Sequence, residues 1–284
     1  MCILEVSELC KAYPSFQLRD VSFSLKEGRI TGLVGRNGAG KTTVLKSILG
    51  FLHPDRGEIT FFGGTPFEGN EQAVKQDIGY LSGGVSFYPN QKLRVISGVT
   101  RRFYRNWDEA AYRDCLTRFG LDENKTPAQL SEGMKVKYAL TLALSHRARL
   151  LILDEPTSGL DPVSREELLD LFLELQDRGV TILFSTHIIS DLEKCADDLI
   201  YLQKGRIRAQ GDLKAFAAGY QSVTLTQAER DQADATQLIG CKRSKEGFTA
   251  LARTGDATAG NVPGTICPAS LETILVHLEQ EETL

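Results

Sequence analysis

The residues best suited to chemistry form one glycine-rich stretch: Gly35, Arg36, Asn37, Gly38, Ala39, Gly40, Lys41 and Thr42. This stretch fits the phosphate-binding loop pattern G-x-x-x-x-G-K-[ST], in which backbone N–H groups surround a phosphate. In such loops the lysine reaches the β- and γ-phosphates and the hydroxyl of the next residue binds Mg²⁺. We therefore predict a nucleotide phosphate site from Gly35 to Thr43. The alternative is a glycine-rich turn with an incidental lysine.

Two adjacent carboxylates, Asp154 and Glu155, follow the apolar run 150–153. Carboxylates at the end of a core strand cost free energy unless a cation or a reaction uses them. In a phosphate-loop protein the first acid helps hold Mg²⁺, and the second can deprotonate the attacking water. We predict Thr42 and Asp154 as metal ligands and Glu155 as the general base. The alternative is an exposed acidic pair at an ordinary strand end.

The elements that position these side chains are strands alternating with helices. The apolar run 30–34 precedes the loop, and a helix-like segment, 43–49, follows it. The continuous apolar runs 150–153 and 180–184 are typical of strands buried on both faces of a parallel sheet. Asp161 is a suitable N-cap for the helix between them, because Pro162 then takes the first helical position. The pattern predicts an α/β fold with a doubly wound core.

The rest of the chain divides into three parts. Segments 3–9 and 18–25 alternate apolar and polar residues, as half-buried strands do. The stretch from about 95 to 146 has helical periodicity. After about residue 216 the sequence becomes polar, with short strand-like pieces, and helical periodicity returns at 270–278. We predict a small α+β appendage there.

Composition excludes several classes of protein. The chain has 284 residues, 42% of them hydrophobic, so it can bury a core. Its net charge of −4 and pI near 5.7 count against nucleic acid as a partner. No apolar run approaches the roughly 18 residues of a membrane span, and the first residues lack the layout of a signal peptide. Six scattered cysteines, without a C-x-x-C pair, indicate reduced cytosolic thiols.

Five further stretches resemble those of ATP-binding cassette (ABC) proteins and come in that family's order. They are Leu130-Ser131-Glu132-Gly133-Met134 (the L-S-G-G-Q signature), 150–156 (the Walker B strand), 157–161 (the D-loop), Ser185-Thr186-His187 (the switch histidine) and Tyr13 (the aromatic that stacks on adenine). The resemblance covers residues 1–215. It implies a P-loop NTPase (RecA-like) core with an antiparallel β subdomain and a helical subdomain at about 85–146. Residues 216–284 would form the small C-terminal accessory domain.

The resemblance also implies a mechanism. Two cassettes pair head to tail around two ATP molecules with Mg²⁺, and each site takes its loop from one copy and its signature from the other. Ser131 and Gly133 would contact the γ-phosphate held by Lys41 of the second copy. Glu155 would be the general base, His187 would contact the γ-phosphate, and Asp161 would link the two sites. The second cassette would be the same chain or a related one, on a separate transmembrane permease at the cytoplasmic face of the cell membrane.

Two departures from the family pattern concern the metal and the signature. The family usually has a Gln near the position of Ser82-Gly83, where it helps bind Mg²⁺ and senses the membrane domain. Within the signature, Glu132 replaces a Gly and Met134 replaces a Gln, while Ser131 and Gly133 are kept. A carboxylate beside a triphosphate is repulsive unless it points to solvent. We therefore expect slower hydrolysis than in a consensus site.

Within the family, the chain most resembles the single-cassette ATPases of bacterial two-component exporters. The local likenesses are Phe87-Tyr88-Pro89-Asn90, 103–108 and 268–275. The aromatic residues of the first two segments either pack within the helical subdomain or receive a coupling helix from the membrane subunit. Both interpretations stay open on the sequence alone.

Two other functions compete with a transporter ATPase. A soluble cassette that remodels nucleic acid or ribosomes usually has two cassettes or a long coiled-coil insertion, whereas this acidic chain has one loop and one signature. A regulatory cassette with weak turnover is disfavoured by Glu155 and His187, although the missing Gln leaves room for it. The transported substrate and its direction are not encoded in this chain, because the membrane subunit selects the cargo.

Overall fold

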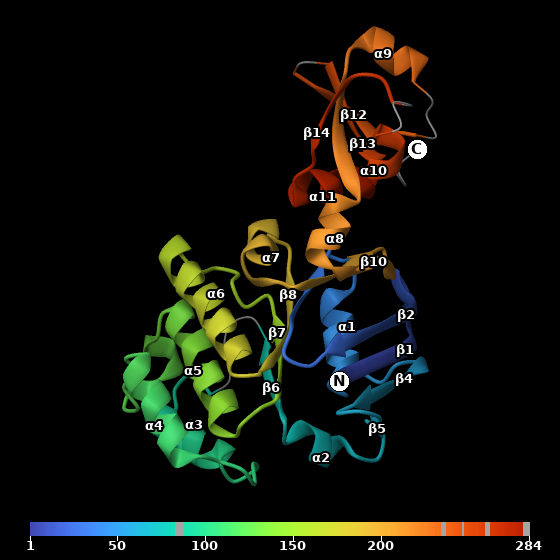
Figure 1. The fold of residues 1–284 in the computed structure, drawn as a ribbon. Helices are drawn as coiled ribbons and strands as arrows, with labels where there is room; N and C mark the ends of the chain where they lie inside the picture. Colours follow the sequence, from blue (N-terminus) through green and yellow to red (C-terminus); the bar gives the residue numbers. More distant parts are fainter. Residues whose placement is uncertain (83–87, 234–236, 246, 259–261, 281–284) are drawn as a thin grey trace. The chain divides into compact units, whose positions relative to one another are not determined.

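The computed structural model describes residues 1–82, 88–233, 237–245, 247–258 and 262–280 (Figure 1). The chain forms two compact units, Met1–Gln210 and Gly211–Leu284. Each unit has its own hydrophobic core. Within the described ranges, no helix has the length and apolar character needed to cross a membrane.

The centre of the first unit is a six-stranded sheet in the order β10-β9-β3-β8-β7-β6. Its strands are β3 (Ile30–Val34), β6 (Ile78–Ser82), β7 (Leu150–Asp154), β8 (Thr181–Thr186), β9 (Asp198–Gln203) and β10 (Arg206–Asp212). Strands β9, β3, β8, β7 and β6 pair in parallel, and β3, β7 and β8 are buried along their whole length. The register pairs Val34 with Thr186 and Asp154 with Ser185. The carboxyl ends of β3, β8 and β7 therefore meet at one edge, where ligands bind in open α/β sheets.

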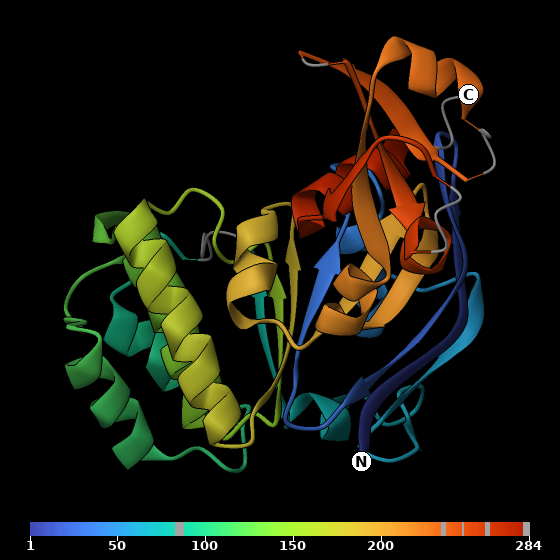
Figure 2. The ribbon, with the colours of Figure 1, turned by 45° about the horizontal axis from the view of Figure 1, so that its top comes forward.

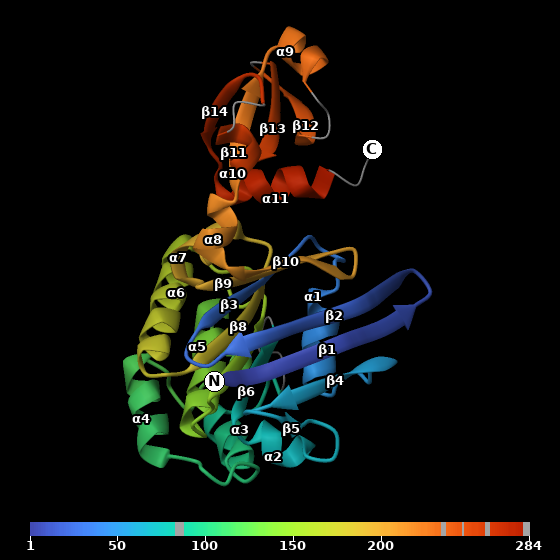
Figure 3. The same ribbon diagram turned by 45° about the vertical axis from the view of Figure 1, so that its right-hand side comes forward.

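A second sheet of the first unit, in the order β2-β1-β4-β5, is antiparallel (Figure 3). Its strands are β1 (Cys2–Tyr13), β2 (Phe16–Lys26), β4 (Arg56–Phe61) and β5 (Thr65–Pro66). On β2 the buried residues Val21, Phe23 and Leu25 alternate with exposed ones, as the two-residue period of a strand requires. They share one core with Val44 and Ile48 of helix α1 (Lys41–Ile48). Each such buried side chain contributes about 1.5–3 kcal/mol to stability.

Helices α3, α4 and α5 lie on the side of the parallel sheet away from β1 and β2 (Figure 2). The helices of this unit besides α1 are α2 (Glu71–Lys75), α3 (Leu93–Thr100), α4 (Glu109–Arg118), α5 (Glu132–Ser145), α6 (Pro162–Asp177) and α7 (Ile189–Cys195), with a short 3₁₀ turn at Pro127–Gln129. The buried hydroxyl of Ser97 on α3 is hydrogen-bonded to Tyr112 of α4 at 2.7 Å and to Tyr138 of α5 at 2.8 Å. This polar contact ties the helical subdomain together.

The second unit is an α+β fold with an antiparallel sheet in the order β12-β13-β11-β14. Its elements are α8 (Leu213–Ala218), β11 (Tyr220–Leu225), α9 (Gln227–Gln232), β12 (Ile239–Ser244), β13 (Gly247–Arg253), α10 (Thr254–Thr258), β14 (Thr265–Pro268) and α11 (Leu271–Gln280). Ile274 of α11 packs on Ile239 and Leu251 of the sheet. The predicted fold class is confirmed, with β12, β14, α9 and α10 as additions that the polar sequence did not predict.

Candidate functional site

The glycine-rich loop joins β3 to α1 and leaves the start of that helix open. Helix α1 begins after Gly40, whose φ of 109° is left-handed, and no side chain caps its N–H groups. A Cβ at Gly35 would lie 2.2 Å from the carbonyl oxygen of Leu202, so only glycine fits there. The first turn of α1 also has no acidic residue. Its unpaired N–H groups and positive dipole end are therefore suited to hold phosphate.

Lys41 lies over this loop and is nearly buried, with 6% of its side chain exposed. Its Nζ donates a hydrogen bond to the carbonyl oxygen of Gly35 at 2.7 Å. The same ammonium lies 3.2 Å from Oε1 of Glu155 at the end of β7. The loop lysine and the predicted base, 114 positions apart in the sequence, are thus in direct contact, and they form one charged cluster.

Glu155 has an unusual backbone. Its φ is 51°, in the left-handed region that costs about 1 kcal/mol or more for a residue other than glycine. Its N–H donates to the hydroxyl of Ser185 at 2.9 Å, and that hydroxyl donates to Oδ1 of Asp154 at 2.6 Å. Ser185, on the neighbouring strand β8, therefore holds both carboxylate residues in place.

His187 follows β8 and contacts the same glutamate. Its Nδ1 lies 2.7 Å from Oε2 of Glu155, and the two side chains are 44% and 21% exposed. Glu155 is consequently placed between an ammonium and an imidazole, with both of its oxygens engaged. The structure brings together three residues that follow three different strands in the sequence.

These residues line a pocket of about 460 Å³ at the carboxyl ends of the strands. The lining consists of Phe16, Arg36, Asn37, Gly38, Gly40, Lys41, Thr42, Thr43, Glu155, Ser158 and His187. Gly35 and Ala39 are not among the described lining residues, but both help to shape the loop: Gly35 accepts the hydrogen bond of Lys41, and the N–H of Ala39 donates to the carbonyl oxygen of Arg36. A pocket of this size, with polar groups at one end, suits a nucleotide.

The aromatic wall of the pocket is Phe16, which sequence reasoning missed. Tyr13, predicted to stack on adenine, is 42% exposed and is not among the described lining residues. Its ring lies 6.5 Å from that of Phe16 across the turn between β1 and β2. The closeness of Phe16 to the loop, where a Cβ at Gly40 would lie 2.6 Å from its ring, depends on tertiary packing. The stacking role of Tyr13 remains a prediction.

Thr42 and Asp154 supply the kind of ligands that the predicted magnesium site needs. The hydroxyl-bearing Thr42 is exposed at the pocket, and Asp154 is 7% exposed at the end of β7. Mg²⁺ takes oxygen ligands and completes its shell with water and phosphate oxygens. Among the described residues no group of three or more His, Cys, Asp or Glu is arranged to hold a metal. The hydroxyl of Thr42 and the carboxylate of Asp154 are oxygen donors of the kind that Mg²⁺ takes.

The position of the family's Gln is next to Asp154. Ser82 ends β6 and is the parallel partner of Asp154 in β7. Gly83 lies outside the described residues. A serine hydroxyl is too short to replace the amide of a glutamine, so we expect water to take its place in the metal shell.

The predicted signature forms the start of α5. Ser131 is the N-cap, and its Oγ accepts a hydrogen bond from the N–H of Met134 at 3.2 Å. Gly133 faces α6, where a Cβ would lie 3.3 Å from the side chain of Ser164. Neither Ser131 nor Gly133 belongs to the described lining of the pocket around Lys41.

Glu132 is half exposed, and its carboxylate pairs with Lys135 one turn along α5, at 2.6 Å. The ion pair offsets part of the negative charge that the sequence placed beside the phosphate. In surface positions such pairs are weak and are screened by salt. The carboxylate therefore remains a source of repulsion for an anion at this helix end.

Asp161 caps α6. Its Oδ1 accepts hydrogen bonds from the N–H groups of Val163 and Ser164 at 3.0 Å, and its Oδ2 accepts one from the Ser164 hydroxyl at 2.6 Å. The Ser164 hydroxyl and these N–H groups hold the pKa of Asp161 below its usual range. The residue is exposed and charged, and it lies outside the described pocket lining.

Some aromatic residues of segment 103–108 pack within the helical subdomain, and another is exposed and can receive a coupling helix. Tyr104 stacks on the buried ring of His146 at 3.7 Å, and Trp107 packs against Tyr112. Burial lowers the pKa of His146 to about 4, so its ring is neutral at pH 7. Phe103, by contrast, is 70% exposed, as is Tyr88 at 65%. Phe87 lies outside the described residues.

Comparisons with known proteins agree with this geometry. The family model described as ABC transporter matches residues 18–158. The chain is 32% identical over 225 residues to the ABC transporter ATP-binding protein YtrB of Bacillus subtilis (strain 168), covering 78% of this chain and 76% of that protein. It is 34% identical to the bacitracin transport ATP-binding protein BcrA of Bacillus licheniformis, covering 72% and 68%. A solved ATP binding subunit of an ABC transporter has 32% identity and a TM-score of 0.68, covering 75% and 91%.

Proposed function

The chain belongs to the ABC transporter family of ATP-binding proteins, and we propose that two copies pair head to tail around two ATP molecules to drive a separate membrane subunit. Family membership makes the chain an ATPase with a P-loop NTPase fold. The pairing, the use of Mg²⁺, the residue roles and the membrane partner are our proposal.

The contacts of Glu155 with Lys41 and with His187 carry the proposal for hydrolysis. The loop holds the phosphates with the N–H groups of α1, and Lys41 turns from Glu155 towards the γ-phosphate. Glu155, freed from the ammonium, accepts the proton of the attacking water, and His187 orients it. Bound Mg²⁺, held by Thr42 and Asp154, would neutralise charge on the phosphate oxygens.

The separation of the signature from the pocket supports the pairing. Ser131 and Asp161 are exposed and Gly133 is half-buried, and all three lie at helix starts outside the described lining around Lys41. The start of α5, where Ser131 caps only one N–H group, can still bind a phosphate that another molecule brings to it. A second copy in head-to-tail orientation supplies that phosphate at each of two equivalent sites.

Exposed apolar residues on α3 and directly after it support a membrane-subunit contact. Val95, Val99 and Phe103 are spaced four residues apart and are 45%, 49% and 70% exposed. Val95 and Val99 lie one turn apart on α3, and Phe103 lies in the turn that follows the helix. Together they can receive an amphipathic helix. We therefore place the docking site for a coupling helix here, at the cytoplasmic face of the membrane. The likeness to a bacitracin transport protein supports a role in transport, and export is the direction that we propose.

A Glu155→Gln variant tests the proposed hydrolysis. It keeps the shape of the side chain but removes the base, so we expect ATP turnover to fall by about 100-fold while ATP binding is retained. Glu68→Gln, at an exposed glutamate outside the pocket lining, is the matched control and should hydrolyse ATP at the wild-type rate. A wild-type rate no faster than that of Glu155→Gln would contradict the proposal.

The same variant tests the pairing. With ATP and Mg²⁺ present, Glu155→Gln should accumulate as a dimer in analytical ultracentrifugation, because the phosphate that joins the two copies is not removed. A monomer at saturating ATP would contradict the head-to-tail arrangement.

A further inference from the structure

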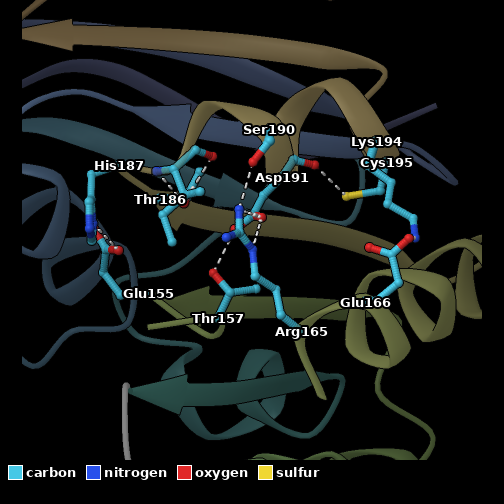
Figure 4. A network of polar contacts seen from close by, with 11 residues as sticks. Glu155, Thr157, Arg165, Glu166, Thr186, His187, Ser190, Asp191, Lys194 and Cys195 are labelled. Atoms are coloured by element: carbon cyan, nitrogen blue, oxygen red, sulfur yellow. Dashed lines mark hydrogen bonds and ion pairs between the residues drawn. The ribbon is translucent and has the colours of Figure 1, made fainter. Parts of the chain in front are cut away.

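A fully buried carboxylate, Asp191, lies in the first turn of α7 (Figure 4). Its Oδ2 accepts a hydrogen bond from the hydroxyl of Thr157 at 2.6 Å, and its Oδ1 accepts one from Nε of Arg165 at 2.5 Å. Nη2 of Arg165 also donates to the hydroxyl of Ser190 at 2.7 Å. A buried ion pair is weak evidence for stability, because its desolvation cost offsets much of the attraction. The contacts of Asp191 are therefore better explained by a role in positioning the segments that they join.

The partners of Asp191 come from segments next to the catalytic residues. Thr157, 1% exposed, lies two residues after Glu155 in the loop that leaves β7. His187 lies four residues before Asp191, between β8 and α7. The Thr157–Asp191 hydrogen bond thus closes a ring of contacts with the Glu155–His187 contact, and Figure 4 shows both contacts in one view.

Arg165 extends the ring to a third segment. It lies in the first turn of α6, directly after the helix start that Asp161 caps. One carboxylate thus joins the segment after Glu155, the segment after His187 and the helix start that carries Asp161. A shift of any of these segments changes the hydrogen bonds of the other two.

We propose that Asp191 is a positioning residue for ATP hydrolysis: through Thr157 and Arg165 it fixes Glu155, His187 and the Asp161 loop in one relative arrangement. The proposal rests on the roles given above to Glu155 and His187. Glu155 has a left-handed backbone that the surroundings must enforce, and the Thr157 contact is part of that enforcement. A displacement of about 1 Å at a catalytic base can cost up to 100-fold in rate.

If Asp191 had only a structural role, its contact with Arg165 would serve to hold α7 against α6. The chain offers a matched control, because Lys194 also joins these helices through ion pairs with Glu166 and with Asp170, the latter at 3.0 Å. Those pairs lie on the surface and do not involve Thr157. Lys194→Gln should therefore loosen the helix pair without changing the rate of hydrolysis.

The test compares Thr157→Val with Thr157→Ser by steady-state ATP hydrolysis. Valine has the shape of threonine without its hydroxyl, so we expect kcat to fall about tenfold with the KM for ATP changed less than about twofold. Serine keeps the hydroxyl and should restore kcat to within about twofold of the wild type. Asp191→Asn weakens the ion pair with Arg165 and should also lower kcat, with the KM for ATP changed less than about twofold.

Equal kcat values for Thr157→Val and Thr157→Ser would overturn the proposal. A loss of kcat in Lys194→Gln as large as that in Thr157→Val would also overturn it, because the effect would then follow helix packing. The ratio of the two Thr157 variants tests Asp191 alone, whereas the wild-type rate relative to Glu155→Gln tests the proposed function.

Discussion

Two helix starts in this chain, those of α1 and α5, differ in how they are prepared for a phosphate: the residue before α1, Gly40, has a left-handed backbone, whereas the residue before α5, Ser131, is extended. Helix α1 begins after Gly40 with uncapped N–H groups and no acidic residue in its first turn. Helix α5 begins at Ser131, whose hydroxyl accepts a backbone hydrogen bond, and has Glu132 in its first turn. One end is open to an anion, and the other is already partly satisfied by its own chain.

The difference indicates that the two helix starts act at different steps. The α1 end can hold a phosphate by itself, because a charged cluster of Lys41, Glu155 and His187 lies beside it. At the α5 end, Ser131 must share its hydroxyl between a backbone N–H and a phosphate, since a hydroxyl can accept one hydrogen bond and donate another. We infer that α1 determines ATP affinity and that α5 affects turnover once a second copy has closed on the nucleotide.

The largest effect is expected at the α1 end. Lys41→Ala removes the ammonium that lies over the loop, so ATP affinity and hydrolysis should fall by about 100-fold or more. Lys46→Ala, in the last turn of the same helix, is the control and should leave both unchanged. Binding is measured with a fluorescent ATP analogue and hydrolysis by phosphate release. An unchanged affinity in Lys41→Ala would remove the distinction between the two helix starts.

A smaller effect, confined to turnover, is expected at the α5 end. Ser131→Ala removes a hydroxyl contact to a charged phosphate, so hydrolysis should fall about tenfold while the ATP affinity of the monomer stays the same. It also removes a helix cap, which costs about 1 kcal/mol. Thr226→Ala removes a comparable cap from α9 in the second unit and controls for that loss. Equal activity losses in the two variants would assign the effect to stability.

The smallest effect is expected at Glu132. Glu132→Gly removes a carboxylate from the phosphate-facing end of α5, so hydrolysis should rise about two- to fivefold at low salt. Glu132→Gln keeps a good helix former and separates the effect of charge from that of helix propensity. The gain should shrink as ionic strength increases, because the side chain is exposed. A rate unaffected by either substitution would show that the Lys135 ion pair already cancels the repulsion.

Short-range sequence patterns predicted the strands, the loop and the main helices well. The apolar runs of β3, β7 and β8 and the Asp161–Pro162 helix start depend on neighbours in sequence, so they were visible without the structure. The resemblance to ABC proteins, the P-loop NTPase fold and the ATPase activity are confirmed by the comparisons.

The missed features depend on contacts between distant segments. Phe16 reaches the pocket because the β1–β2 turn packs on Gly40, and Asp191 meets Thr157 because β7 and β8 are neighbours in the sheet. Neither residue belongs to a local pattern that indicates chemistry. The short strand β14 is mostly exposed and lacks the alternation that identifies a half-buried strand.

The most direct test of the two-copy site is a mixing experiment. Lys41→Ala disables the loop half of a site, and Gly133→Asp disables the signature half by placing a carboxylate beside the phosphate. In a mixed head-to-tail dimer one site receives both defects and the other receives none, so mixing two inactive proteins should restore about a quarter of the wild-type ATPase rate. Lys41→Ala mixed with Glu155→Gln, which share the loop half, should stay inactive. No gain from the first mixture would contradict a site built from α1 of one copy and α5 of the other.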